Sequence, residues 1–188
     1  MKYKLQYIEA VNRSDKLDLV HKGKVLPLKA KPIKDQKLRA YYDASYYLLA
    51  QLGCQDTGKL VRNCANIHYN LYKFLTDQKL PCQITIGEFH RQGRMYAKYA
   101  TTDELIEEMK SPNYGEQIDL HTWLTLPDGS AMDWTILPDM LALDGRLLPS
   151  LGECCIHVEA NEHDPEHYYV PQLVGASYLE NIGAVHPF

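Results

Sequence analysis

One cysteine in this sequence stands where a thiol could act as a nucleophile. Cys64 opens the stretch 64–77, whose apolar residues recur at the spacing of one helix face, and Asn63 before it is a good N-cap residue. The free N–H groups and the dipole of a helix N-terminus favour a thiolate, and they can also bind the oxyanion of a tetrahedral intermediate. Position alone nevertheless favours the simpler interpretation that Cys64 is a small apolar residue of the helix stripe.

A histidine and an aspartate in a later hairpin change that balance. His121 and Asp133 flank the segment 127–129, Pro-Asp-Gly, which is typical of a type I turn followed by a glycine bulge. In that register Trp123 faces Asp133, so His121 and Asp133 lie diagonally on one face of the sheet with their backbones ~7–8 Å apart. A two-residue Asp-Gly turn would instead place the two side chains on opposite faces.

The three residues fit the roles of a Cys-His-Asp triad. Cys64 would attack a carbonyl, His121 would take the thiol proton and pass it to the leaving group, and Asp133 would fix the tautomer of the imidazole. His68, one helical turn after Cys64, is a second candidate base, but its side chain is expected along the helix flank rather than over the thiol. The structural alternatives are a hydrogen-bonded strand histidine at 121 and a solvent-facing hairpin residue at 133.

The elements expected around these residues form an α+β pattern, with helices first and a mostly antiparallel sheet after them. Helical spacing and start signals predict helices at 36–52, 64–77, 102–110 and 136–143. Alternation and turn residues predict strands at 83–89, 95–99, 121–126, 130–135 and 155–158, and short strands at 2–8 and 24–28. The whole chain, residues 1–188, is expected to form one domain with a core at about 36–136 and terminal extensions packed on it.

Three short motifs occur in order: Asn-Cys-Ala at 63–65 opens a helix, His-Thr-Trp-Leu at 121–124 lies on a strand, and Asp-Trp-Thr at 133–135 lies on the next strand. Together with the strand-like stretch 81–87, which ends in Gly, they resemble the transglutaminase-like superfamily of papain-related cysteine enzymes over about residues 58–136. The resemblance implies a papain-like core, in which the helix bearing the cysteine packs on a mostly antiparallel sheet bearing the histidine and the aspartate. It also implies a Cys-His-Asp triad.

The sequence departs from the family pattern immediately before the cysteine. The usual Gly-x-Cys or Trp-Cys lead is replaced by Arg62 and Asn63. This change leaves the second donor to the oxyanion open, with Gln51 and Gln55 as candidates.

The first functional hypothesis is an acyl-transfer enzyme that acts on an amide bond of a peptide or protein through a Cys64 thioester. Water as acceptor gives a peptidase, amidase or deamidase, and an amine acceptor gives a transglutaminase-type transferase. Hydrolysis is favoured because the chain is small and shows no lid domain. Trp123 and Tyr168 are the candidate substrate-binding residues. The second hypothesis is a non-catalytic protein- or glycan-binding module on the same fold, which the missing glycine favours and the intact triad opposes.

A third hypothesis, a zinc site, comes from a ligand-rich segment near the C-terminal end. Cys154, His157, His163 and His167 are of residue types that bind zinc. The segment lacks a Cys-x₂-Cys pair and is acidic and loop-like, so a solvated polar loop is the preferred interpretation. No glycine-rich phosphate loop or dinucleotide fingerprint occurs either, and no cofactor is expected.

Bulk composition narrows the environment in which this chemistry would operate. The net charge of −4 argues against a general nucleic-acid partner, although the segment 22–39 carries seven cations against one acid and is expected to be solvated. No apolar run is long enough for a bilayer and no secretory signal is recognised, so we expect no membrane partner and a location in the cytoplasm. Five cysteines without such a signal fit a reducing compartment. The sequence does not specify the oligomeric state.

Overall fold

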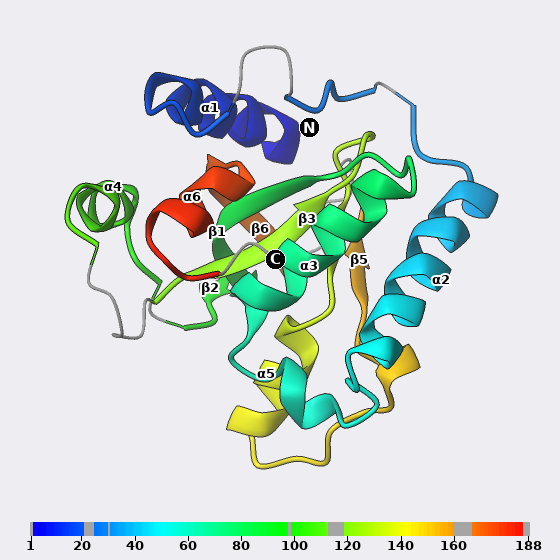
Figure 1. Ribbon diagram of the computed structural model, residues 1–188. Coiled ribbons are helices and arrows are strands. Elements are labelled where there is room, and N and C mark those ends of the chain that lie inside the picture. Colours follow the sequence, from blue (N-terminus) through cyan, green and yellow to red (C-terminus); the bar gives the residue numbers. More distant parts are fainter. Residues whose placement is uncertain are drawn as a thin grey trace.

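An antiparallel sheet forms the centre of the structure, and helices cover both of its faces (Figure 1). This computed structural model describes residues 2–20, 25–29, 31–97, 99–112, 119–159 and 167–185. Within these ranges the sheet has six strands, in the order β2-β1-β3-β4-β5, and β6 also pairs with β1. The strands are β1 (Gln83–Arg91), β2 (Arg94–Met95), β3 (His121–Thr125), β4 (Ala131–Asp133), β5 (Ile156–Val158) and β6 (His167–Val174). The fold is therefore α+β, as the sequence predicts.

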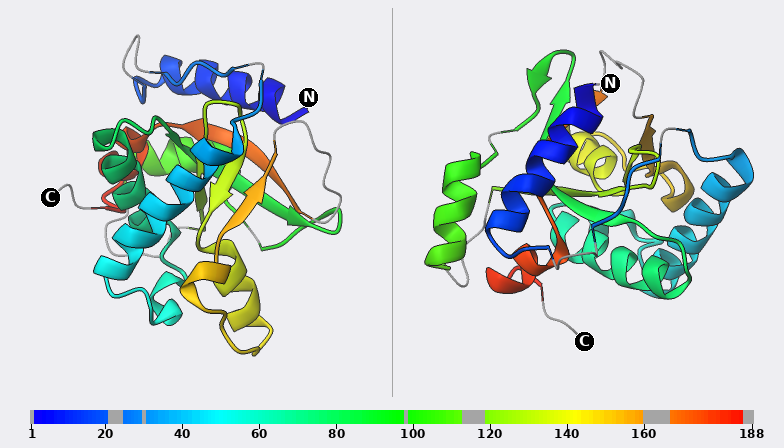
Figure 2. Two further views of the ribbon diagram at one scale, coloured as in Figure 1. Left: turned by 90° about the vertical axis from the view of Figure 1, so that its right-hand side faces the viewer. Right: turned by 90° about the horizontal axis from the view of Figure 1, so that it is seen from above.

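The helices lie on the two faces and at the edges of the sheet (Figures 1 and 2). The described α-helices are α1 (Lys2–Lys16), α2 (Asp35–Gln51), α3 (Cys64–Asp77), α4 (Thr102–Lys110), α5 (Ile136–Leu143) and α6 (Ala176–Asn181). Single 3₁₀ turns occur at η1 (Thr57–Leu60) and η2 (Leu151–Glu153). Helix α3 packs against β3 and β1, α2 packs against α3, and α1 packs against β6. The helix that carries Cys64 is thus held directly on the strand that carries His121.

The N-terminal segment is a helix, so the strand predicted at 2–8 is wrong. Tyr7, Ala10 and Ser14 recur at helical spacing and are fully or almost fully buried. The Ser14 hydroxyl accepts a hydrogen bond from the backbone N–H of Val174 at 2.8 Å, which fixes α1 on β6. The alternation that suggested a strand covers only the first half of this longer helical pattern.

Two further strand predictions also need correction. The strand predicted at 24–28 is absent from residues 25–28, and Lys24 lies outside the described residues. Of the strand predicted at 95–99, only Met95 lies in a strand, as the second residue of β2, and residue 98 lies outside the described residues. Strand β1 runs on to Arg91, and the chain turns into β2 at Gln92 and Gly93. Both turn residues have positive φ values, 51° and 73°, which suit a tight hairpin.

The four helices that the sequence predicts all occur in the structure, with closely similar bounds. Helices α3, α4 and α5 have the predicted bounds, and α2 differs from its predicted range by one residue at each end. The start of α4 is fixed by a capping box, in which the Thr101 hydroxyl accepts from the Glu104 N–H and the Glu104 carboxylate accepts from the Thr101 N–H. Strand β6 and helix α6 were not predicted.

The hairpin between β3 and β4 has the predicted register. Leu124 pairs with Met132 and Thr125 pairs with Ala131. The N–H of Gly129 donates to the Leu126 carbonyl at 2.8 Å, and Gly129 has a φ of +86°, as a type I turn with a glycine bulge requires. Continued by one pair, this register sets Trp123 opposite Asp133 and leaves His121 and Asp133 on one face.

Close packing around β1 explains the glycine at position 87. The register between β1 and β6 shifts between Ile86 and Gly87. A Cβ atom at Gly87 would lie 2.1 Å from the Val170 carbonyl oxygen and 3.0 Å from the Trp123 ring. The bulge and the buried indole therefore require a residue without a side chain here.

Candidate active site

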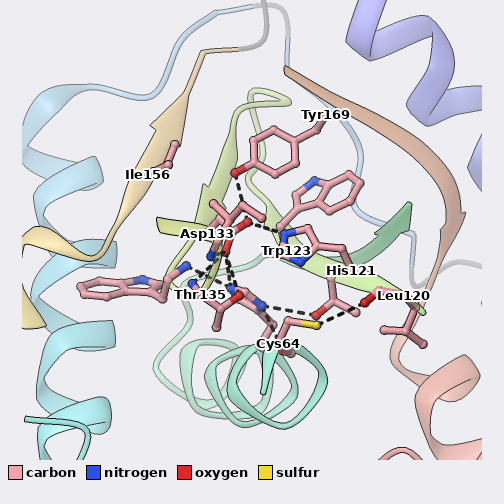
Figure 3. A network of polar contacts seen from close by, with 12 residues as sticks. Cys64, Leu120, His121, Trp123, Asp133, Thr135, Ile156 and Tyr169 are labelled. Carbon is pink, nitrogen blue, oxygen red and sulfur yellow. Dashed lines mark hydrogen bonds and ion pairs between the residues drawn. The ribbon is translucent and has the colours of Figure 1, made fainter. Parts of the chain in front are cut away.

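The side chains of His121 and Asp133 form a short, buried hydrogen bond. His121 Nε2 lies 2.6 Å from Asp133 Oδ2, and both residues are almost completely removed from solvent. His121 begins β3 and Asp133 ends β4, so the hairpin register brings them together (Figure 3). An ionised carboxylate only accepts hydrogen bonds, so His121 must donate from Nε2. This arrangement leaves Nδ1 of the ring available toward Cys64.

The Asp133 carboxylate is held by several donors in addition to His121. Its Oδ1 accepts from the Thr135 N–H at 2.9 Å, from the Thr135 hydroxyl at 3.1 Å and from the Ile136 N–H at 3.1 Å. Its Oδ2 also accepts from the Tyr169 hydroxyl at 3.0 Å. The Asp-x-Thr spacing thus has a direct physical reason. A threonine two residues after the aspartate can donate to the carboxylate from both its N–H and its hydroxyl, just before α5 begins.

These contacts decide the charge of the pair. Burial alone would raise the pKa of Asp133, but the charge and hydrogen bond of His121, with further help from His68 and the Thr135 N–H, hold it well below its ordinary value. Burial alone would likewise lower the pKa of His121, but the charge and hydrogen bond of Asp133 and the side chain of Cys64 raise it. The site therefore favours an aspartate and an imidazolium.

Cys64 lies at the first position of α3 and its sulfur points toward the start of β3 (Figure 3). The thiol donates to the Leu120 carbonyl oxygen at 3.6 Å, and a side-chain hydrogen bond to His121 is among the influences that raise the pKa of the histidine. Cys64 is half-buried and makes no disulfide. The structure thus brings Cys64, His121 and Asp133 together at one place.

The other four cysteines have environments that disfavour a thiolate. Burial raises the pKa of Cys82 to about 12 and that of Cys154 to about 11, where the Glu153 charge adds to the effect. Burial also raises the pKa of Cys54 and of Cys155. Cys54, Cys82 and Cys154 are buried in the core.

Cys64 and His121 are both among the residues that line a cavity of about 630 Å³. Its wall also includes the side chains of Tyr96, Tyr99 and Asp139. The Tyr99 ring centroid lies 6.1 Å from that of His121. The volume lies within the range of small-molecule and peptide side-chain pockets. A substrate group that enters this cavity lies next to both Cys64 and His121.

The loop before Cys64 is held in an uncommon conformation by an aspartate from α5. Arg62 has a φ of +54°, which a residue with a Cβ rarely adopts. Its N–H donates to Asp139 Oδ1 at 2.6 Å, so the carboxylate stabilises the strained backbone two residues before the nucleophile. Burial raises the pKa of Asp139 to about 6, against the opposing influence of the Arg62 N–H.

The two residues predicted to bind substrate do not border this cavity. Trp123 is fully buried, and its indole N–H donates to the Tyr3 hydroxyl at 2.8 Å. Tyr168 lies on β6, where its ring stacks on His90 at a centroid distance of 4.6 Å. The structure therefore gives Trp123 a packing role, and a substrate contact for Tyr168 stays a prediction.

The proposed oxyanion donors Gln51 and Gln55 are exposed and do not line the cavity either. Asn63 and Asn66 do line it, and Asn66 donates to the Asn63 side-chain oxygen at 3.0 Å. The first N–H groups of a helix have no partner within the helix, so the N–H of Cys64, at the start of α3, is a candidate oxyanion donor.

The zinc hypothesis receives no support from the residues that the structure describes. Among them, no group of three or more histidine, cysteine or acidic side chains is arranged to hold a metal ion. Cys154 is buried and its thiol donates to the Ser150 carbonyl oxygen at 3.4 Å. His163, one of the four suggested ligands, lies outside the described residues.

Comparisons of the chain with family models, with curated proteins and with solved structures found no match. The functional argument therefore rests on the geometry of the site. Across the described part of the chain, the structure also contains no helix with the length and apolar character needed to cross a membrane.

Sequence reasoning missed two residues that the site brings close to the triad, Tyr169 and Asp139, and gave a third, His68, a different role. Tyr169 reaches Asp133 from β6, a strand that the sequence did not predict. Asp139 was placed correctly in a helix, but nothing local indicates that its carboxylate holds Arg62. His68 was considered as a base, whereas it lies fully buried behind the triad and does not border the cavity.

Proposed function

We propose that this chain is a cysteine-nucleophile acyl-transfer enzyme that acts on an amide bond, with Cys64, His121 and Asp133 as its catalytic triad. One observation carries the proposal: the buried Asp133 carboxylate holds the imidazole of His121 at 2.6 Å, and the Cys64 side chain lies close enough to that imidazole to raise its pKa through a hydrogen bond. Both Cys64 and His121 border the same cavity. Nucleophile, base and orienting acid are thus arranged in the order that thiol catalysis needs.

The chemistry follows from the protonation states that the site favours. His121, as the imidazolium, already holds on Nδ1 the proton given up by the Cys64 thiol, so the sulfur attacks the carbonyl carbon of the amide as a thiolate while the carbonyl electrons move to oxygen. The tetrahedral intermediate then collapses as the C–N bond breaks and the imidazolium gives its proton to the departing amine. The products of this half-reaction are a thioester on Cys64, a free amine and a neutral His121.

The second half-reaction restores the enzyme. Neutral His121 takes a proton from water as the oxygen attacks the thioester carbonyl, and the C–S bond breaks to release a carboxylic acid and the thiol. Asp119 and Asn66 line the cavity and are exposed, so water reaches this wall, which supports hydrolysis over transfer to an amine. The substrate class that we propose is a peptide or protein amide.

The fold proposed with this function is a papain-like core of the transglutaminase-like kind. Its support is the arrangement of the helix α3, which begins with the cysteine, on the antiparallel sheet whose adjacent strands β3 and β4 carry the histidine and the aspartate. The motifs at 63–65, 121–124 and 133–135 supply the resemblance in sequence.

A peptide panel with a strong external nucleophile tests the proposed function. The protein is incubated with peptides that carry glutamine, asparagine and C-terminal amide groups, with and without hydroxylamine. Mass spectrometry then detects deamidation, cleavage or hydroxamate formation. We expect product with the wild type and none with Cys64→Ala, whose circular dichroism spectrum should match. An active Cys64→Ala variant would refute the mechanism. Absence of product and of any thioester in the wild type across the panel would instead favour the non-catalytic binding module.

A further inference from the structure

A second histidine, His68, lies directly behind the proposed triad. It is fully buried on α3, one turn after Cys64. Its Nδ1 lies 3.1 Å from the Cys64 carbonyl oxygen and 3.3 Å from the Thr122 hydroxyl oxygen. Its Nε2 accepts from the Trp134 backbone N–H at 3.2 Å and lies 3.5 Å from Asp133 Oδ1. Both ring nitrogens are thus engaged by groups that belong to the site.

The partners of the two nitrogens determine where the ring proton lies. The Trp134 N–H can only donate, so Nε2 must offer a lone pair. The Cys64 carbonyl oxygen can only accept, so Nδ1 must carry the proton. One neutral tautomer satisfies both contacts, and the cation would set an Nε2–H against the Trp134 N–H. Burial agrees with this assignment, because it lowers the pKa of His68 to about 4 against the opposing charge of Asp133.

The same ring connects all three elements that carry the triad. It contacts Cys64 itself at the start of α3, Thr122 beside His121 on β3, and Trp134 beside Asp133 at the end of β4. Relative displacement of any one of these elements would break at least one of the contacts. The titratable groups that act on the ring are those of Asp133 and His121, whereas Cys64 contacts it through the backbone carbonyl.

We propose that His68 is a positioning residue, which as the neutral Nδ1–H tautomer holds the Cys64 helix, the His121 strand and the Asp133 strand in their mutual register. Its catalytic consequence rests on the proposed function, whereas its tautomer and contacts do not. His68 is accordingly not the base of the reaction, because its ring is fully buried and both of its nitrogens are occupied away from the cavity.

Nitrogen-15 NMR of the histidine rings tests the tautomer without any substrate. The wild-type protein is labelled on histidine, and the His68 signals are assigned by their loss in His68→Asn. We expect one ring with Nδ1 protonated and Nε2 unprotonated at about pH 8, unchanged at about pH 6 where free histidines become cations. A His68 ring that carries its proton on Nε2, or that is a cation at about pH 6, would overturn the proposal. Because no turnover is measured, this result is independent of the proposed function.

Variants separate positioning from general stability. His68→Gln places an amide oxygen where it can accept from Trp134, whereas His68→Leu removes both polar contacts. Leu71→Ala, which empties a fully buried site on the same helix, is the control for a loss of stability alone. We expect His68→Leu to lower kcat and the alkylation rate of Cys64 by about 10- to 100-fold with little change in KM, the size of effect seen when a residue that orients a metal ligand is lost. His68→Gln should recover part of this loss, and Leu71→Ala should lower the melting temperature while both rates persist.

These measurements distinguish a failure of the positioning role of His68 from a failure of the proposed function. Wild-type turnover and alkylation in a folded His68→Leu protein would refute the positioning role. Equal loss of the alkylation rate in Leu71→Ala and His68→Leu would also refute it, because the effect would then follow stability. If His68→Leu does not fold, the NMR tautomer of the wild type still decides the proposal, together with the kcat and alkylation rate of His68→Gln compared directly with those of the wild type: a cation or an Nε2–H ring, or wild-type rates in His68→Gln with Leu71→Ala equally slow, would refute it. A peptide panel without product removes the proposed function but leaves the NMR result standing.

Discussion

The hydroxyl of Tyr169 donates a hydrogen bond at 3.0 Å to Oδ2 of Asp133, the same oxygen that His121 Nε2 contacts at 2.6 Å. Tyr169 lies on β6 and Asp133 ends β4, two strands that are not neighbours in the sheet. The contact shows how strongly the sheet curls around the site. It also means that the charge of Asp133 is shared between the proposed base and a residue far away in sequence.

Replacement of Tyr169 by Phe tests how much the hydrogen bond to Asp133 contributes to stability and to turnover. A hydrogen bond to a charged group contributes about 1.5–3 kcal/mol, so we expect Tyr169→Phe to lower the free energy of unfolding by an amount in this range. Turnover should fall only several-fold, because His121 and the Thr135 N–H still hold the carboxylate. Urea unfolding and peptide turnover measure the two effects. Tyr178→Phe, which removes a buried hydroxyl bonded to the Leu105 carbonyl, is the control, and its turnover should stay at the wild-type level.

Replacement of Asp133 by Asn should affect catalysis far more than Tyr169→Phe does. An amide nitrogen directed at His121 would donate to Nε2 and move the ring proton to Nδ1, so the imidazole could no longer accept the thiol proton. We expect kcat to fall by about 10⁴-fold, the size of effect seen when a triad loses its tautomer control. The amide oxygen can still accept from the Thr135 N–H, so circular dichroism should report a folded protein. Turnover within about tenfold of the wild type would remove Asp133 from the mechanism.

The raised pKa of Asp139 should make the stability of the folded chain depend on pH. Burial raises the pKa of Asp139 from its ordinary value to about 6 in the folded chain, so between about pH 4 and pH 6 the folded state keeps a proton that the unfolded state loses. Asp139 therefore lowers stability progressively as pH rises through this window, and the loss is complete above it. Asp139→Asn has no charge to bury and keeps an oxygen for the Arg62 N–H.

Thermal unfolding of the two proteins over a range of pH measures this difference. We expect Asp139→Asn to gain stability relative to the wild type as pH rises from about 4 to about 6, with a constant gain at higher pH. Asp144→Asn, at an exposed carboxylate just beyond the same helix, is the matched control. A difference between wild type and Asp139→Asn that does not change with pH would show that Asp139 does not titrate in this range.

The parts of the site that the sequence could predict are those with a local cause. The turn residues at 127–129 specify the hairpin register, and the register alone places His121 and Asp133 on one face. The apolar spacing after Asn63 specifies where α3 begins, and so places Cys64 at a helix start. In both cases the deciding interactions lie within a few residues of one another along the chain.

The parts that the sequence could not predict depend on contacts between distant segments. Strand β6 pairs with β1, and no residue near Tyr169 indicates that its hydroxyl will meet Asp133. The hydrogen bond from the Arg62 N–H to Asp139 likewise joins residues far apart along the chain. No residue near either one indicates this bond, and the positive φ of Arg62 that accompanies it is visible only in the structure. The same reason applies to His68, whose contacts to Thr122 and Trp134 exist only after the sheet has formed against α3.

Selective alkylation of Cys64 is the most direct measure of whether this thiol is a nucleophile. Iodoacetamide reacts with thiolates, and burial raises the pKa of Cys54, Cys82, Cys154 and Cys155. Cys64 is half-buried beside the cavity, at a helix start and against a histidine that favours the cationic form. At about pH 6 we therefore expect Cys64 to be modified first, with peptide mass spectrometry locating the adduct.

The His121→Ala variant tests whether the ion pair causes this selectivity. Without the imidazolium, the thiolate of Cys64 loses its partner, so its alkylation at about pH 6 should slow by an order of magnitude or more. Labelling of Cys64→Ala gives the background from the other four thiols, which should be slow and unchanged by His121→Ala. Modification of Cys64 no faster than that background would show that its sulfur is a packed residue of the α3 stripe rather than a nucleophile.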